Sequence, residues 1–192
     1  MIGIHLNYIP GAYERDPGSR PLTAAERSFL AARDAWVESE GAYWHLHATR
    51  PQTLAYALND SPVGLAAWIV EKYRSWSDCN GDVERRFTKD EMLANISLYW
   101  FTETIGSSVR YYHEGRHTAR SYKDLDPMTV PAGVAVFPRE EPMPPREYAA
   151  RFYNVVRWTE QPAGGHFAAM EEPRALAGEV RAFFRQVRRN GM

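Results

Sequence analysis

The order of apolar and polar residues predicts strands near both ends of the chain and helices between them. Apolar residues recur every three or four positions through the middle, and they alternate or run together in the terminal segments. Two capping boxes, Thr23–Glu26 and Thr88–Glu91, indicate helix starts, because hydroxyl and glutamate each satisfy a free backbone N–H there. The predicted elements are a strand over residues 2–9, helices over 23–40, 51–58, 62–76 and 89–112, a strand over 134–137, a helix over 145–152, a strand over 154–159 and a helix over 175–188.

Prolines and glycines separate these elements. Gly41 is expected to end the first helix, residues 77–87 to form a polar loop, and residues 113–130 to be irregular. The result is one strand, about four helices and then a β-α-β-α segment. This order predicts an α/β fold in which the middle of the chain is an all-helical insertion.

Charge and cysteine content narrow the function classes. Across 192 residues, 23 Lys and Arg balance 24 Asp and Glu, so we expect no nucleic-acid partner. The single cysteine, Cys79, cannot form an intrachain disulfide. No apolar run reaches the roughly 18 residues of a membrane span, and the first residues lack the basic start of a signal peptide. These features predict a soluble cytoplasmic protein.

The stretch AGGHFAAMEEP, residues 163–173, contains the first candidate for catalysis. His166 follows a predicted strand on a glycine-flanked turn, where open α/β sheets place their functional sites. A base of this kind needs an acid that holds its tautomer, and Glu140 follows the neighbouring predicted strand. Glu141 competes for that role. The order of acid and then histidine is that of α/β-hydrolases, although no Gly-x-nucleophile-x-Gly turn occurs in this chain.

Two histidine motifs raise the question of a metal. His113-Glu114-Gly115-Arg116-His117 has the spacing of a zinc-protease helix. The glycine and the polar flank argue against a packed metal helix, so we interpret the match as chance. His45 and His47 could share a metal only on an extended segment with a third ligand. Neither motif leads us to predict a metal site.

Four segments together resemble epoxide hydrolases of the microsomal and juvenile-hormone type, over nearly the whole chain from about Ile2. The segments are ALNDSPVGLAAWIVEKYRSW (57–76), NISLYWFTETIGSSVRYY (95–112), VPAGVAVFPRE (130–140) and AGGHFAAMEEP (163–173). The resemblance implies the C-terminal portion of an α/β-hydrolase fold, meaning its last three strands with their helices, and a helical cap. It places the first core strand and linker in residues 1–20, the cap in 21–128 and the C-terminal core segment in 129–192.

The resemblance also implies a reaction without metal or organic cofactor, in which a small apolar epoxide and water give a vicinal diol through an ester on the enzyme. His166 corresponds to the base and Glu140 to its acid partner. Tyr43 and Tyr112 correspond to the cap tyrosines that donate hydrogen bonds to the epoxide oxygen, and Tyr111 is the competitor for Tyr112. Phenols suit this task because ring opening develops alkoxide character.

The chain departs from the family pattern because the aspartate nucleophile motif and the H-G-W-P loop are absent from it. We therefore expect the chain to be inactive alone, since the covalent step needs that nucleophile. A second reading is a non-catalytic remnant, or a domain that a partner chain completes. A third, from a different class, is a metalloprotease using His113, Glu114 and His117. The first strand should also leave one sheet edge open to self-association.

Overall fold

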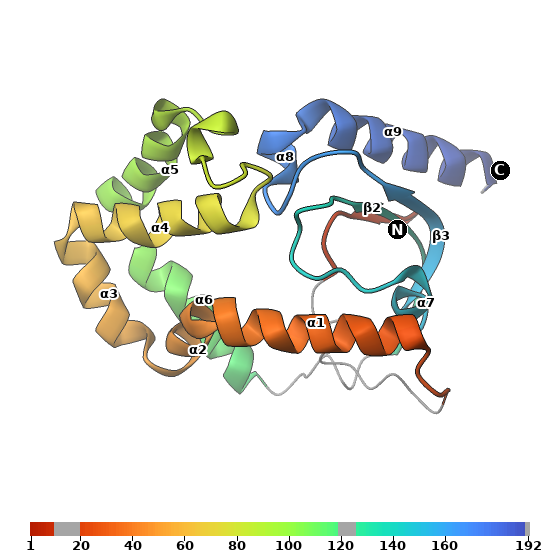
Figure 1. Cartoon of the computed structure of the whole chain (residues 1–192), viewed down its shortest axis with the longest axis horizontal. Helices are drawn as coiled ribbons and strands as arrows, with labels where there is room; N and C mark the ends of the chain where they lie inside the picture. Colours follow the sequence, from red (N-terminus) through yellow and green to blue (C-terminus); the bar gives the residue numbers. More distant parts are fainter. Residues whose placement is uncertain (10–19, 119–125, 191–192) are drawn as a thin grey trace. The chain divides into compact units, whose positions relative to one another are not determined.

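The structure is a computed structural model that describes residues 1–9, 20–118 and 126–190, and the chain divides into two compact units. We call residues 1–34 with 121–192 the sheet unit and residues 35–120 the helical unit (Figure 1). Helix α1 (Ala24–Glu40) begins in the sheet unit and ends in the helical unit.

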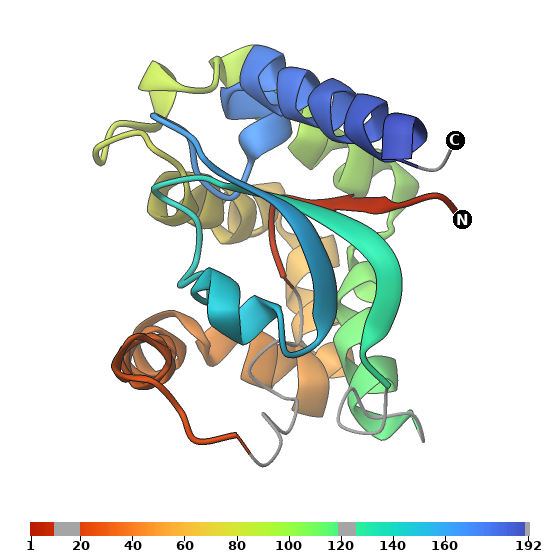
Figure 2. The ribbon, with the colours of Figure 1, turned by 90° about the vertical axis from the view of Figure 1, so that its right-hand side faces the viewer.

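In the part of the sheet unit that the structure describes, three parallel strands lie in the order β1 (Ile4–Leu6), β2 (Met128–Val136) and β3 (Tyr153–Glu160). The central strand, β2, shifts its register against β3 around Pro131. A proline lacks the N–H that a central strand would donate, so an irregularity is expected at this position. A second shift follows between Ala132 and Gly133, pairing is regular from Gly133 to Val136, and β2 and β3 end side by side (Figure 2).

Successive side chains along β2 point to opposite faces of the sheet. Helices cover both of these faces. On one face, Phe183 of α9 (Pro173–Asn190) is fully buried, and a Cβ atom at Gly133 would come within 2.6 Å of its ring. Helix α9 therefore lies close to the sheet backbone (Figure 2). The other face is covered by α7 (Arg146–Ala149) and the first turns of α1. The buried residues there are Ile9, Phe29, Val134, Tyr148, Ala149 and Phe152.

A buried ion pair fixes the start of α1 in the sheet unit. The carboxylate of Glu26 is fully buried and accepts hydrogen bonds from Arg151 Nε and Nη2, both at 2.8 Å. It also accepts the backbone N–H of Thr23, as a capping box requires. The hydrogen bond from Arg151 holds the pKa of Glu26 at about 2, well below its usual value, despite burial.

The helical unit contains five helices of its own within the described residues, and Figure 1 labels them. They are α2 (Ala42–Thr49), α3 (Pro51–Asp60), α4 (Pro62–Trp76), α5 (Lys89–Thr102) and α6 (Ile105–His117), with a short 3-10 turn at Val83–Arg85. Their buried core contains Leu54, Ala55, Leu58, Leu65, Ile96, Ile105 and Val109. Gly106 lets α6 approach α3, because a Cβ there would lie 3.3 Å from that of Ala55.

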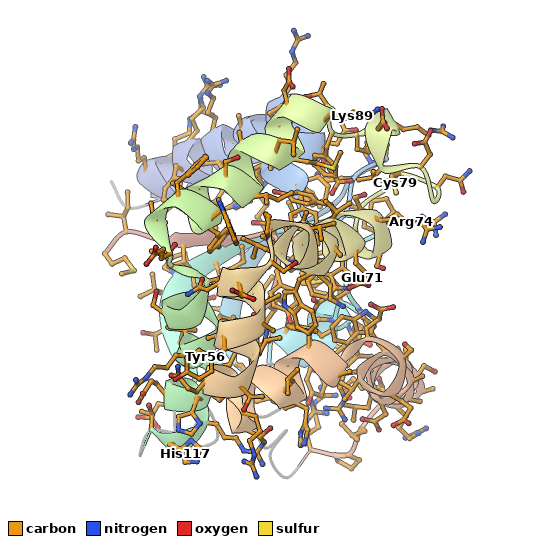
Figure 3. All side chains as sticks on the ribbon, turned by 90° about the vertical axis from the view of Figure 1, so that its left-hand side faces the viewer. Tyr56, Glu71, Arg74, Cys79, Lys89 and His117 are labelled. Carbon is orange, nitrogen blue, oxygen red and sulfur yellow. The ribbon has the colours of Figure 1, made fainter. Side chains whose placement is uncertain are left out.

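The loop after α4 buries the only cysteine of the chain. Cys79 is 1% exposed, and its thiol donates to the carbonyl of Arg74 at 3.2 Å. Figure 3 shows both residues at this end of the helical unit. The guanidinium of Arg86 binds Asp78, also in this loop, at 2.8 Å. The polar loop that the sequence predicts is therefore held by specific contacts.

Several predicted boundaries are confirmed. Helices begin after both capping boxes, and the box at Thr88 has both of its reciprocal hydrogen bonds. Pro51 and Pro62 each open a helix, as predicted. The strand predicted over 154–159 is β3, and the terminal helix is α9. The predicted cap bounds, 21 and 128, stay predictions.

Other predictions are wrong. The predicted helix over 89–112 is two helices, because Glu103 adopts a left-handed conformation with φ 55° and ends α5. The segment after Gly41 is helix α2, which was not predicted because Gly41 and Pro51 stand at its two ends. The predicted irregular segment 113–130 is helical to His117 and extended from Met128; residues 119–125 lie outside the described residues. The first and sixth predicted elements also change length: β1 is shorter than residues 2–9, and β2 is longer than 134–137.

Candidate active site

The ends of β2 and β3 bring together the predicted base and its predicted acid. Glu140 Oε1 lies 2.6 Å from His166 Nδ1. The side chain of Glu140 is 1% exposed and that of His166 is 27% exposed. A short contact from a buried carboxylate to a partly accessible imidazole is the arrangement that orients a catalytic histidine.

The turn that carries His166 is held by its own hydrogen bonds. The carboxylate of Glu171, itself 8% exposed, accepts the backbone N–H groups of Gly165 and Phe167 at 3.0 and 3.1 Å. Gly164 has φ +102°, and a Cβ there would lie 2.8 Å from the ring of Phe137. Only glycine adopts this conformation without strain. The residues on both sides of His166 are thereby fixed.

The contact with Glu140 also determines the tautomer of His166. A carboxylate accepts hydrogen bonds, so Nδ1 carries the proton in the neutral ring and Nε2 carries the basic lone pair. Burial lowers the pKa of His166, but the hydrogen bond and charge of Glu140, with the charges of Glu141 and Glu171, outweigh it. The net effect raises the pKa of His166 above its usual value. The pair is therefore arranged to accept and hold a proton.

The two adjacent glutamates are not equivalent. Glu141 Oε1 lies 4.0 Å from His166 Nδ1, beyond hydrogen-bond range, whereas its backbone N–H donates to Glu140 Oε1 at 2.9 Å. The geometry favours Glu140 as the orienting carboxylate. Its second oxygen, Oε2, is buried and has no hydrogen-bond partner among the described residues.

In the helical unit, the two predicted tyrosines lie against each other. Tyr43 is in α2 and Tyr112 in α6, and their ring centres are 6.0 Å apart in an edge-to-face contact. Tyr111, the competitor, is 78% exposed. The geometry places Tyr112 edge-to-face against Tyr43, whereas Tyr111 contacts Tyr112 from a largely exposed position, with ring centres 6.4 Å apart.

A histidine that the sequence did not assign to this cluster contacts both tyrosines. The ring centre of His47 is 5.5 Å from that of Tyr43 and 4.8 Å from that of Tyr112. His47 is 6% exposed, and its Nε2 accepts the indole N–H of Trp68 at 3.3 Å. The neutral ring therefore carries its proton on Nδ1, which has no partner among the described residues. Burial, with a contribution from Lys72, lowers the pKa of His47 to about 4.

The structure gives no support to the three-ligand metal sites considered from the sequence. The described residues contain no group of three or more His, Cys, Asp or Glu side chains that could hold a metal ion. His45 and His47 lie on helix α2, not on an extended segment. Glu114, the acid of the protease-like motif, is paired with Arg110 at 2.9 Å. None of the described helices has both the length and the apolar character to cross a bilayer.

Comparisons with known proteins agree on one family. A putative epoxide hydrolase of Stigmatella aurantiaca is 44% identical over 189 residues, which are 98% of this chain and 42% of that protein. Epoxide hydrolase 1 of Sus scrofa is 41% identical over 153 residues, covering 75% of this chain and 34% of that protein. The chain belongs to the epoxide hydrolase family. No protein-family model matches it.

The solved structures extend this relationship to the fold. The crystal structure of juvenile hormone epoxide hydrolase from the silkworm Bombyx mori superposes with a TM-score of 0.82 at 28% identity, covering all of this chain and 50% of that one. The epoxide hydrolase of Aspergillus niger gives a TM-score of 0.74 at 32% identity, over 96% of this chain and 46% of that one. The chain thus has the C-terminal portion of an α/β-hydrolase fold, as predicted, and it spans less than half the length of the curated relatives it matches.

Sequence reasoning missed two contributors to these sites. The sequence analysis gives Glu171 no role, although its spacing after His166 suits a carboxylate that folds back onto a turn. His47 was considered only as a metal ligand. The four-residue spacing from Tyr43 would have placed both on one helix face, had α2 been recognised.

Proposed function

We propose that this chain carries the proton-transfer and oxygen-binding groups of an epoxide hydrolase, which converts an epoxide and water into a vicinal diol. The observation that carries the proposal is the 2.6 Å contact between Glu140 and His166. Supporting it are the turn held by Glu171 and the membership of the epoxide hydrolase family. A base with a buried carboxylate partner suits the hydrolysis of an ester intermediate.

In the proposed second step, Nε2 of His166 accepts a proton from water as the oxygen of that water attacks the ester carbonyl. The bond between the acyl carbon and the alkyl oxygen then breaks, so the alkyl group leaves as an alkoxide. Glu140 stabilises the imidazolium that forms, and the raised pKa of His166 favours this protonated state. The imidazolium then protonates the leaving alkoxide to give the diol, and the regenerated carboxylic acid loses its proton to solvent to become a carboxylate again.

In the proposed first step, the phenols of Tyr43 and Tyr112 donate hydrogen bonds to the epoxide oxygen. Ring opening places negative charge on that oxygen, and two weakly acidic donors stabilise it without being ionised at neutral pH. The contact between their rings, 6.0 Å centre to centre, supports a joint role. The aromatic neighbours Trp68 and Trp76 favour a small apolar aryl or alkyl epoxide.

The carboxylate nucleophile of the first step is proposed to come from outside residues 1–192, either encoded upstream or carried by a partner chain. The test therefore starts with the DNA upstream of the Met1 codon. If the frame continues and encodes a nucleophile, the longer protein and the present chain are each incubated with styrene oxide, and the diol is measured by chromatography. We expect diol from the longer protein and only the buffer rate from the present chain.

A His166→Gln substitution in the longer protein separates the two steps. Ester formation should continue and hydrolysis should stop, so intact-protein mass spectrometry should show an increase equal to one epoxide while diol no longer accumulates. His45→Gln is the matched control, since His45 is an exposed histidine and its loss should leave turnover unchanged. Undiminished diol formation in His166→Gln would refute the proposed base.

A second candidate function is that of a non-catalytic module completed by another chain. Among the described strands, β1 is paired only with β2, so its other edge offers N–H and C=O groups to a further strand. This reading gains support if an upstream stop codon or frameshift closes the frame. It predicts association of the purified chain in size-exclusion chromatography with light scattering, and a monomer at all concentrations would count against it.

A further inference from the structure

Helix α6 ends with two histidines whose rings are in contact. His113 and His117 are four residues apart, so they share one face of the helix. Their ring centres are 4.2 Å apart and their planes are inclined by 36°. His113 is half-buried, and His117, labelled in Figure 3, is exposed at the helix end. We call these two residues the α6 histidine pair.

Backbone carbonyl groups determine which nitrogen carries the proton in each neutral ring. His113 Nδ1 lies 3.1 Å from the carbonyl oxygen of Ala48, and His117 Nδ1 lies 2.8 Å from that of His113. A carbonyl can only accept, so each Nδ1 must carry a proton. Each neutral ring therefore has its lone pair on Nε2. An imidazole that donates from one nitrogen to a carbonyl and offers the other is the usual form of a metal-binding histidine.

We propose that the α6 histidine pair is a two-ligand site for a borderline divalent transition-metal ion, with Cu²⁺ bound more tightly than Ni²⁺ or Zn²⁺. A tetrahedral Zn²⁺ about 2.0–2.1 Å from each nitrogen needs the nitrogens roughly 3.4 Å apart, and a tetragonal Cu²⁺ at the same distance needs them roughly 2.9 Å apart. Rings whose centres are 4.2 Å apart can reach these spacings. Imidazole ligands suit these metals, and copper has the highest affinity among them.

The surroundings tolerate a cation and define the coordination. The carbonyl end of α6 carries partial negative charge, which favours a positive ion beside His117. The nearby charges of Arg110 and Glu114 balance each other in an ion pair, whereas Arg116 in the last turn of α6 and Arg50, which lines the same pocket as His113, oppose a bound cation. Within the described residues no third metal-binding side chain completes the site, so the proposal assigns the other coordination positions to water. The site is thus a chelate on a helix and not the centre of a metalloprotease. It does not depend on the proposed epoxide chemistry.

The test uses the 192-residue chain and simple metal salts. Titration with CuCl₂, followed by absorption of the bound ion, should give one ion per chain. His117→Ala removes one ligand from an exposed position and should weaken binding about a hundredfold or more, because the second imidazole then no longer binds intramolecularly. His45→Ala is the matched control, since His45 is exposed on α2, and it should bind as the parent chain does. Glu114→Gln should also bind normally.

Nitrogen-detected NMR of the histidine rings gives an independent measurement. Without metal, both rings should show the proton on Nδ1, and ZnCl₂ should shift Nε2 of both together. Equal Cu²⁺ affinity in the parent chain and in His117→Ala would overturn the proposal, as would protons found on Nε2. A loss in Glu114→Gln as large as that in His117→Ala would also overturn it, because the carboxylate would then be the second ligand.

Discussion

The burial of His47 should make the stability of the helical unit depend on pH. The pKa of His47 is about 4 in the folded chain and 6.5 in an unfolded one, so only the unfolded chain takes up a proton between these values. Above pH 6.5 both states are neutral and stability is at its full value. As pH falls below 6.5, stability decreases by about 1.4 kcal/mol per pH unit, until the folded ring also protonates near pH 4.

The expected magnitude follows from the two pKa values. Between pH 8 and pH 5, His47 should reduce the free energy of unfolding by about 2 kcal/mol. His47→Gln removes this contribution, because an amide does not titrate, while its oxygen can still accept the indole N–H of Trp68. The variant should therefore lose less stability than the parent chain over this pH range, by about 2 kcal/mol.

Urea unfolding followed by tryptophan fluorescence at both pH values measures this difference. Five of the six tryptophans lie in residues 35–120, so the signal reports mainly on the helical unit. Comparing the variant with the parent chain separates the contribution of His47 from those of two other histidines. Burial also lowers the pKa of His5, and the pKa of His166 is raised. His45→Gln is the control and should keep the parental pH dependence. An identical pH dependence in His47→Gln and the parent chain would refute the reasoning.

Three further substitutions test other parts of the structure. In Glu140→Gln the pKa of His166 should fall, because burial then acts without its main carboxylate partner; NMR titration of the ring measures it, and an unchanged pKa would contradict the assigned pairing. Glu26→Gln should destabilise the sheet unit by about 3 kcal/mol in urea unfolding, because it leaves the buried charge of Arg151 unpaired, and a change under about 1 kcal/mol would contradict this. Glu103→Gly should raise stability by up to about 1 kcal/mol, because glycine adopts φ 55° without strain, and a loss of stability would argue against that conformation.

Local signals in the sequence were sufficient for the elements whose ends depend on neighbouring residues. The capping box at Thr88 is formed by residues three positions apart, so it could be recognised without a structure. The break after α5 could not be predicted, because Glu103 adopts a conformation usually associated with glycine or asparagine. Helix α2 was missed because Gly41 and Pro51 stand at its two ends and can equally mark an interruption.

The candidate site also contains one contact that the sequence predicts and one that it does not. The pairing of Glu140 with His166 could be predicted because adjacent parallel strands end at the same edge of a sheet. The contact of His47 with Tyr112 depends on how α2 packs against α6, which residue spacing alone does not determine. The family resemblance suggested both tyrosines, and the structure adds the histidine that contacts both of them.

The burial of the single cysteine makes the helical unit suitable for thiol-exchange measurements. Cys79 is 1% exposed, so an alkylating reagent can react only when the loop after α4 opens. The reaction gives one mass increment per chain, because the sequence contains no other thiol. The reaction rate as a function of reagent and urea concentration therefore measures how often this one segment opens, and no cysteine has to be introduced.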